Sequence, residues 1–210
     1  MKRCSNPFCR WFVCGLFACC LGLGAATASA ESPDKAKATS KDATQDQMMA
    51  EMLKYSMPGT QHELLKPMAG TWKATIKAWT GPGDPTVSVG TCENTWILGG
   101  RYLESSYKAD FMGKPFEGLG LVGFDMKEKK FVNLWMDTMS TTYMASSGEM
   151  DPSGKTLSFS GTVPDPVSGK PLPYRMVTKI IDPNQHVFSM YGAHDGKEAL
   201  EMEITYTRLQ

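Results

Sequence analysis

Apolar and polar side chains alternate along two stretches of the chain, at 71–79 and at 200–208. In the first, tryptophan, alanine and isoleucine alternate with lysine and threonine; in the second, leucine, methionine, isoleucine and tyrosine alternate with glutamate and threonine. An alternation with a period of two is typical of a β-strand with one buried face. Eight more candidate strands lie between them, at residues 86–97, 101–111, 116–125, 130–138, 142–150, 155–163, 174–182 and 185–192. The pattern therefore predicts ten strands.

Turn-forming residue pairs separate the predicted strands. They are Asp84-Pro85, Gly99-Gly100, Asp151-Pro152, Asp165-Pro166, Asp182-Pro183 and Asp195-Gly196. Short consecutive strands with short connections favour an antiparallel meander, and closing the meander into a barrel removes the unpaired edges that promote aggregation. We therefore predict an all-β fold, a single antiparallel up-and-down β-barrel of about ten strands over residues 70–209. A two-sheet sandwich is the alternative that the same spacing allows.

One or two short helices are expected before the barrel, within residues 46–69. Asp46 can cap a helix, and methionine and leucine recur at helical spacing over 48–53. A second helical turn is predicted where Thr60 and Glu63 have the spacing of a capping box, in which each side chain bonds the other residue's backbone amide. We expect these helices to close one end of the barrel.

The beginning of the sequence has the features of a secretory signal peptide. Basic residues precede an apolar run at 11–26, and Ala28-Ser29-Ala30 gives the small-x-small pattern of a signal peptidase site. We expect residues 1–30 to be removed after Ala30 and the protein to be exported, to the periplasm or outside the cell. Residues 31–45 contain no large apolar side chain and are expected to form a flexible leader.

A second processing route is open. Leu16-Phe17-Ala18-Cys19 resembles the lipobox of bacterial lipoproteins, in which the cysteine becomes lipidated. The alternative to soluble export is therefore a lipoprotein anchored at Cys19, and only in that case do we expect a membrane partner.

Charge and cysteine content limit the partners and the covalent bonds of the protein. The chain has 22 basic and 22 acidic side chains, and this balance argues against a nucleic-acid partner. Cleavage after Ala30 would leave Cys92 as the one remaining cysteine, so no disulfide could form within the mature chain. We expect a domain held together by burial, as a monomer or a weak homo-oligomer.

The two ends of the predicted barrel resemble the calycin pattern of lipocalins and fatty-acid-binding proteins. Gly70-Thr71-Trp72 opens the first strand after a short helix, and Arg208 ends the last strand. In calycin barrels the arginine packs over the tryptophan. The resemblance implies that Trp72 and Arg208 close one end of the barrel, and a guanidinium over an indole contributes about 0.5–2 kcal/mol.

An ordered set of short motifs over residues 57–209 resembles the bacterial family called domain of unknown function 1579. The motifs are His62-x-x-Leu65, Gly70-Thr71-Trp72, Trp96-Ile97-Leu98-Gly99-Gly100-Arg101, Phe116-Glu117-Gly118-x-Gly120, Gly123-Phe124-Asp125 and Trp135-x-Asp137. This resemblance implies a lipocalin-like barrel and an exported bacterial protein, and it supplies no reaction.

Sequence motifs of common enzymes and cofactor sites are absent or out of context. The run from Gly118 to Gly123 matches the dinucleotide fingerprint as text, but a strand follows it where that motif needs a helix. The chain has three histidines and neither a Gly-x-Ser-x-Gly nor a His-Glu-x-x-His motif. We expect no metal and no cofactor. A haem-binding barrel remains an alternative, with His186 as its candidate because Phe188 and Met190 share the face of that histidine.

Charged and aromatic side chains on the middle strands are the candidates for a ligand site. If the charged ones point into the barrel, they would orient the polar head of a ligand whose body rests on the aromatic ones. The charged candidates are Glu93, Arg101, Glu117 and Asp137, and the aromatic candidates are Trp96, Tyr107, Trp135 and Tyr143. The alternation does not fix which face of these strands is the inner one.

The leading interpretation is an exported barrel that binds a small amphipathic or apolar molecule. The competing interpretation is an enzyme that uses Glu117 or Asp137 as a general acid or base, with a pKa raised by burial in the same cavity. A third is an envelope protein whose barrel is filled by its own side chains. The sequence leaves open whether the protein is an enzyme.

Overall fold

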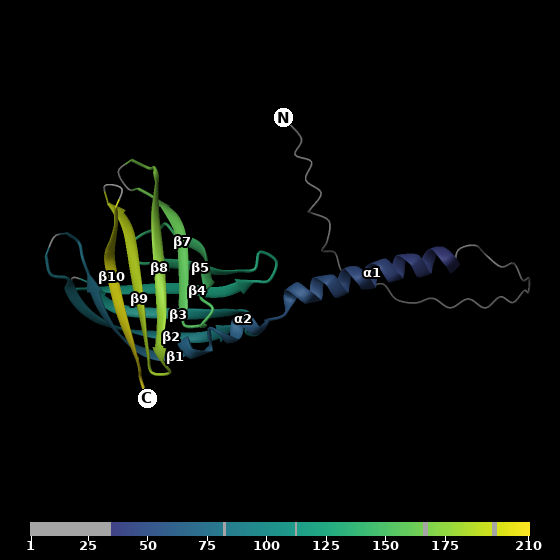
Figure 1. Ribbon diagram of the computed structural model, residues 1–210, viewed down its shortest axis with the longest axis horizontal. Helices are drawn as coiled ribbons and strands as arrows, with labels where there is room; N and C mark the ends of the chain where they lie inside the picture. The colour runs from purple at the N-terminus through teal and green to yellow at the C-terminus, as the bar shows by residue number, and fades with distance from the viewer. Residues whose placement is uncertain (1–34, 82, 112, 166–167, 195–196) are drawn as a thin grey trace, which may run out of the picture. The chain divides into compact units, whose positions relative to one another are not determined.

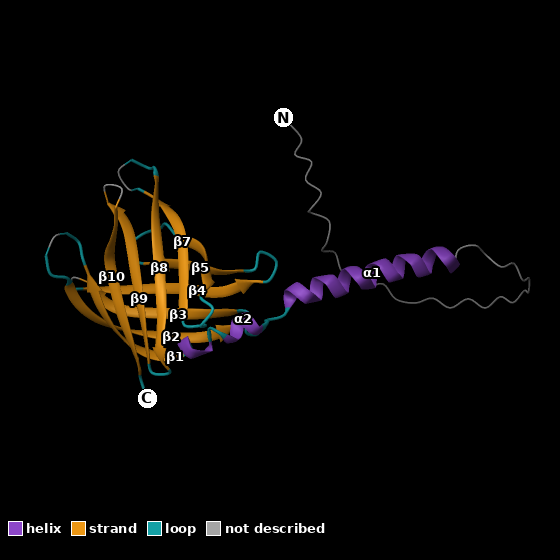
Figure 2. Cartoon of the chain, in the orientation of Figure 1, coloured by secondary structure: helices purple, strands orange, loops and turns teal. Residues whose placement is uncertain are grey.

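The ten strands of the described chain follow one another around a closed barrel, and each pairs antiparallel with its neighbours in the sequence. The computed structural model describes residues 35–81, 83–111, 113–165, 168–194 and 197–210. The strands are β1 (Gly70–Ala78), β2 (Thr86–Ile97), β3 (Tyr102–Phe111), β4 (Lys114–Asp125), β5 (Lys130–Asp137), β6 (Met144–Met150), β7 (Thr156–Pro164), β8 (Pro171–Asp182), β9 (Gln185–His194) and β10 (Lys197–Arg208). Figure 1 and Figure 2 show the barrel they form.

Pairing of the first strand with the last closes the barrel. β1 pairs with β2 on one side and with β10 on the other, so the sheet has no free edge there. The prediction of an up-and-down barrel of about ten strands is confirmed, and the sandwich alternative is wrong. The fold follows from the alternation itself, because ten half-apolar strands joined by short turns bury their apolar faces most completely when the sheet curls onto itself.

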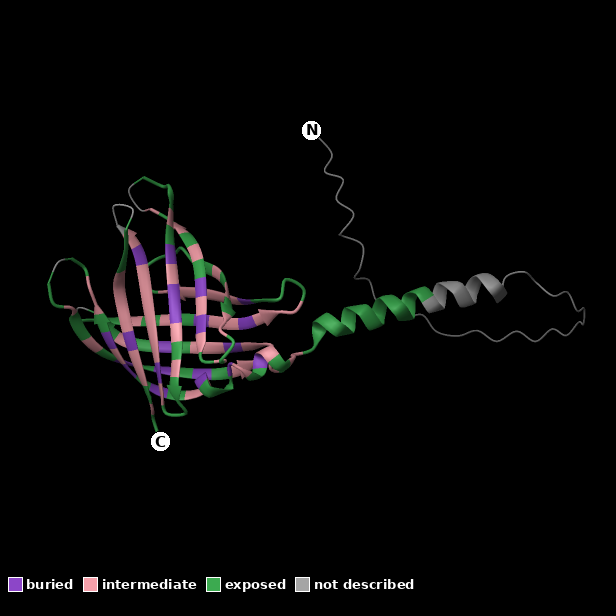
Figure 3. Cartoon of the chain, viewed as in Figure 1, coloured by how far each residue is buried: buried purple, intermediate pink, exposed green. Residues whose placement is uncertain are grey.

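The helix α1 (Lys35–Ser56) begins well before Asp46, so the segment expected as a flexible leader is helical from Lys35 onward. The chain divides into two compact units, residues 1–45 and residues 46–210, and α1 contains the boundary. Its alanine, lysine and glutamine residues favour a helix without any apolar face. Residues 44–56 are all exposed (Figure 3). Among the described residues, no helix is long and apolar enough to cross a membrane.

The expected signal peptide, the cleavage site after Ala30 and the lipobox at Cys19 lie outside the described residues. They stay predictions.

Two short helical segments cover one end of the barrel, which we call the closed end. They are α2 (Thr60–Glu63) and the 3₁₀ helix η1 (Lys66–Met68). Leu65, between them, is fully buried in a core cluster with Leu103 and Phe131. The predicted Thr60 capping box is wrong, because α2 is capped at Gly59, whose N–H donates to Nδ1 of the buried His62 over 3.1 Å.

Trp72 and Arg208 lie at the closed end, where the first and last strands meet. The Arg208 guanidinium lies over the Trp72 ring, with its carbon 4.1 Å from the ring centroid. The same guanidinium donates to the carbonyls of Pro67, Ala69 and Pro183 over 2.8–2.9 Å. Trp72 Nε1 in turn donates to the carbonyl of Met68. This is the arrangement that the calycin resemblance implies. Its hydrogen bonds connect the segment around η1 to both β1 and β10.

The strand register decides which side chains point inward. Trp72, Cys92, Tyr107, Gly118 and Asp137 stand opposite one another across five neighbouring strands. Because paired residues point to the same side of a sheet, all five share the inner face with the buried Trp72. Buried and more exposed positions alternate along the strands accordingly (Figure 3).

A β-bulge in β10 changes the expected facing of its first half. The register shifts between Leu200 and Met202, so Leu200 pairs with Tyr191 on the outer face, although the alternation predicted it to point inward. The bulge turns Glu201 inward, where it lies against Gly192: a Cβ on that glycine would overlap the Glu201 carboxylate. The extra residue of a bulge is what a period of two cannot show.

Candidate functional site

Three aromatic side chains gather on the inner wall toward the end of the barrel opposite α2, which we call the open end. This aromatic cluster consists of Tyr107 on β3, Phe116 on β4 and Trp135 on β5. Tyr107 meets Phe116 edge to face, with ring centroids 5.9 Å apart at 80°, and meets Trp135 at 6.2 Å and 69°. Tyr107 is buried, whereas Phe116 and Trp135 keep part of their surface accessible. The cluster therefore forms a part of the inner wall whose aromatic surface other side chains leave partly uncovered.

Two glycines hold the Trp135 ring against the barrel wall. Gly118 and Gly120 lie on the inner face of β4, in register with Asp137 and Trp135. A Cβ on Gly118 would overlap the ring of Trp135, and a Cβ on Gly120 would lie 3.3 Å from it. The glycines that resembled a dinucleotide fingerprint thus lie within a strand and leave room for an indole.

Gly118→Ala is expected to lower the free energy of unfolding by about 1–3 kcal/mol, because the added methyl must displace the Trp135 ring or the strand beneath it. Urea unfolding followed by tryptophan fluorescence measures both the stability and the change at the ring. Gly81→Ala is the matched control, since a Cβ there meets no atom within 4 Å. Equal unfolding midpoints for the two variants would contradict the packing of Trp135 on Gly118.

Asp137 fixes the edge of the same indole. Its Oδ2 accepts a hydrogen bond from Trp135 Nε1 over 2.8 Å, and its Oδ1 accepts one from the backbone N–H of Met139 over 2.9 Å. The residue is half-buried and ends β5 on the inner face. A carboxylate is therefore held at a defined place beside an accessible aromatic wall.

The structure brings together three of the eight predicted ligand residues: Tyr107, Trp135 and Asp137. Glu93 and Glu117 are exposed and lie on the outer face, so they do not meet the condition under which they would hold a ligand. Each stands next to an inner residue in the sequence, Cys92 or Gly118, and alternation sends the two neighbours to opposite faces.

The remaining three candidates lie elsewhere. Trp96 is on the inner face but packs against the core of the closed end. Arg101 lies in the turn before β3 and donates to the carbonyl of Leu98 over 2.9 Å. Tyr143 is 63% exposed, in the connection between β5 and β6. Phe116 was missed; its spacing of two from Gly118 would have indicated it once the inner face was known.

Neither carboxylate proposed as a catalytic acid or base lies in the setting that such chemistry needs. Glu117 is exposed on the outer face of β4, away from the apolar interior of the barrel. Both oxygens of Asp137 already accept a hydrogen bond, one from Trp135 Nε1 and one from the Met139 backbone N–H. Within the described ranges, no group of three or more histidine, cysteine, aspartate or glutamate side chains is placed to hold a metal ion.

His186 lies deep in the closed half of the barrel. Its ring stacks on Tyr206 at 4.5 Å and meets the edge of Trp72 at 4.4 Å, and only 4% of the residue is exposed. Its Nδ1 has no hydrogen-bond partner among the described atoms. Burial, and then the charge of Arg208, lower the pKa of His186 from 6.5 to about 4. A haem does not fit this setting, since a porphyrin beside the imidazole would displace Trp72 or Tyr206.

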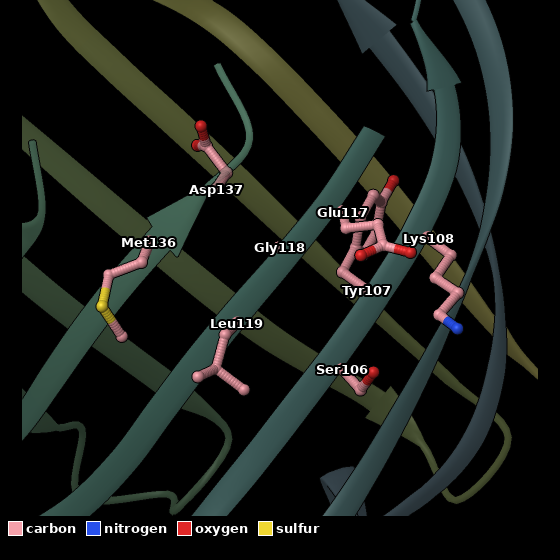
Figure 4. A pocket seen from close by; sticks show the side chains of 8 residues that line it. All are labelled: Ser106, Tyr107, Lys108, Glu117, Gly118, Leu119, Met136 and Asp137. Atoms are coloured by element: carbon pink, nitrogen blue, oxygen red, sulfur yellow. The ribbon is translucent and has the colours of Figure 1, made fainter. Parts of the chain in front are cut away.

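Two shallow hollows lie on the outer wall. One, of about 360 Å³, lies over β3–β5 and includes the outward-facing Lys108, Glu117 and Leu119 (Figure 4). The other, of about 690 Å³, extends from β3 to β7 and includes Leu121 and Leu134. Both are open to solvent and shallow, so neither encloses a ligand as a small-molecule site does.

Comparisons with known proteins place the chain by family and fold. Its fold is similar to the crystal structure of Rv2717c from M. tuberculosis, with a TM-score of 0.56 and 12% identity over 73% of this chain and 100% of that chain. It also matches EF1p2_mFAP2b bound to DFHBI (TM-score 0.39, 14% identity, 71% and 100% covered) and a redesigned beta barrel, b11L5F_LGL (0.37, 17%, 74% and 99%). No curated protein matches the sequence.

The family comparison covers the barrel and the two short helices before it. The profile of the family described as "Protein of unknown function (DUF1579)" matches residues 57–208, most of the chain. The motifs that carried the sequence resemblance all lie within this range. The chain therefore belongs to the DUF1579 family of proteins of unknown function.

Proposed function

We propose that the protein binds a small molecule with an apolar body, on the inner wall at the open end of the barrel. The observation that carries the proposal is that Phe116 and Trp135 point inward and yet stay partly accessible. Met144 and Met202, also on the inner face, are partly accessible as well. An apolar ligand would cover this surface and gain about 25 cal/mol for each Å² removed from water.

The packing of the closed half of the barrel supports the proposal, because it gives the accessible rings a rigid base. Trp72, Ile76, Cys92 and Ile204 are buried in one cluster against which Phe116 and Trp135 pack. A packed core next to accessible aromatic rings is typical of a ligand pocket. In such a pocket a rigid wall offers apolar area, and a few polar groups fix the orientation of the ligand. Burial raises the pKa of the Cys92 thiol to about 12, so this cysteine stays protonated and serves as packing.

Trp135→Ala is expected to weaken the binding of a neutral aromatic probe, 1-naphthalenemethanol, at least tenfold, because a buried tryptophan anchor typically contributes 2 kcal/mol or more. Titration calorimetry measures the affinity. Leu119→Ala is the matched control, since Leu119 lies on the outer face of the same wall and is 37% exposed. Equal losses in the two variants would contradict a site on the inner wall.

Native mass spectrometry of the processed protein tests the proposal without a chosen probe. A retained small molecule would support it, and the measured mass would also report cleavage after Ala30 or a lipid on Cys19, both of which we propose from the first thirty residues. A protein that carries no ligand and binds no apolar probe would overturn the proposed function and favour a barrel filled by its own side chains.

A further inference from the structure

We infer that the ligand of the open end is an organic cation: a molecule with a protonated or quaternary nitrogen attached to an apolar, preferably flat, body. This inference rests on the proposed function and names the chemical class of its ligand. It is drawn from the accessible rings of Phe116 and Trp135, from the carboxylate fixed beside Trp135, and from the position of the other inner charges.

The rings of the aromatic cluster offer what a cation prefers. The face of an aromatic ring carries partial negative charge, and a cation within about 6 Å of the centroid is attracted to it. Tyr107 stands at 80° to Phe116 and at 69° to Trp135, so it meets each of these two rings edge to face. Phe116 and Trp135 keep part of their surface accessible, so these two rings are the ones that a cationic group can contact. Trp135, pressed onto Gly118 and Gly120, is the most firmly placed of the three.

Asp137 adds a full negative charge at the edge of this cluster. The hydrogen bonds from Trp135 Nε1 and the Met139 N–H occupy one acceptor position on each carboxylate oxygen. An ionised carboxylate has about four such positions, so about two remain for a ligand. No ion pair that involves Asp137 is formed within the part of the chain that the structure describes. Its charge is therefore available to a bound cation.

The other inner charges do not reverse this preference. Arg208 lies at the closed end, engaged with Trp72 and three backbone carbonyls. Lys114 and Lys197 stand at strand ends on the open rim and are exposed. Glu201, turned inward by the bulge, is a second acidic group on the inner side. A ligand with a carboxylate head, such as a fatty acid, would bring like charge toward Asp137, and this repulsion excludes it from the same pose.

Three probes that share one body test the inference. They are 1-naphthylmethylammonium, 1-naphthalenemethanol and 1-naphthylacetate, which place a positive, neutral or negative group next to the same naphthalene. Titration calorimetry at pH 7 is expected to give the tightest binding for the ammonium, about tenfold tighter than the alcohol, and the weakest for the acetate. Raising the salt concentration is expected to lower the affinity for the ammonium and to leave the affinity for the alcohol unchanged.

Asp137→Asn assigns the charge to its residue. The variant is expected to reduce the advantage of the ammonium over the alcohol to threefold or less, because the asparagine carries no charge. It is expected to change the alcohol's own affinity less than twofold, since the asparagine oxygen can keep the bond from Trp135 Nε1 while the bond from the Met139 N–H is lost. Glu117→Gln is the matched control, since it removes the same charge from the exposed outer side of the wall, one residue from Gly118. It is expected to leave the order of the three probes unchanged.

The outcomes separate the two proposals. If the wild-type protein binds the alcohol or the acetate as tightly as the ammonium, the inference fails while the proposed function stands. If none of the three binds, the proposed function fails. An Asp137→Asn variant that folds and keeps the full preference overturns the inference; should the variant unfold, the probe order and the salt dependence of the wild-type protein decide it alone.

Discussion

Trp72→Ala is expected to lower the free energy of unfolding by about 3–5 kcal/mol, the range found when a fully buried large aromatic side chain is truncated. Trp72 has no exposed surface, donates its Nε1–H to the Met68 carbonyl, and packs against both Arg208 and His186. The truncation therefore leaves a cavity and removes the ring over which Arg208 lies. Urea unfolding at pH 7, followed by far-ultraviolet circular dichroism, measures the loss.

Trp72→Phe separates the two contributions. Phenylalanine keeps a ring face for the Arg208 guanidinium but cannot donate to the Met68 carbonyl, so we expect a smaller loss, about 1–2 kcal/mol. A loss below about 1 kcal/mol for Trp72→Ala would show that the contact between the first and last strands adds little to stability, against the interpretation of the closed end.

Stability is expected to fall by about 3 kcal/mol between pH 7 and pH 4 through His186 alone. Burial first, and the nearby Arg208 charge second, lower the pKa of His186 from 6.5 to about 4. Below pH 6.5 His186 therefore binds a proton in the unfolded chain but not in the folded chain. Each decrease in pH over this range favours unfolding. The loss begins near pH 6.5 and levels off below pH 4, where both states are protonated.

His186→Phe isolates this contribution, since phenylalanine keeps a ring between Trp72 and Tyr206 and cannot titrate. We expect its unfolding free energy to fall less steeply than that of the wild-type protein over this pH interval. His62, whose pKa is also lowered mainly by burial, and Asp151, whose pKa is lowered mainly by a hydrogen bond from the Thr156 backbone, act equally in both proteins. Identical slopes would refute the assignment, as would an NMR titration of His186 centred near 6.5.

The alternation of side chains was sufficient to predict the barrel, and insufficient to predict its inside. A period of two identifies strands such as β1 whatever their partners are, and ten of them with short turns leave few architectures. Facing depends on register with the neighbouring strand, and a shift of one residue exchanges the two faces. Glu117 and Asp137 were equivalent candidates for this reason, and the pairing of Gly118 with both Tyr107 and Asp137 separates them.

Two other differences have local physical causes. The bulge at Glu201 depends on one extra residue between paired strands, which alternation within β10 does not reveal. The early start of α1 depends on helix propensity without an apolar face, and a search for apolar spacing overlooks such a helix. Trp72 and Arg208 are separated by 135 residues in the sequence, so no local pattern predicts their contact. Only the family resemblance implied it.

That separation has a consequence for biogenesis. β10 is the partner of β1, so an elongating chain can assemble nine strands into a curved ribbon and still have two unpaired edges. Only pairing of the tenth strand, β10, with β1 closes the barrel. This pairing closes a loop that spans nearly the whole domain, so it is slow. Until then the edges are templates for intermolecular strand pairing. The chain is therefore most prone to self-association in the interval before its C-terminal strand pairs with β1.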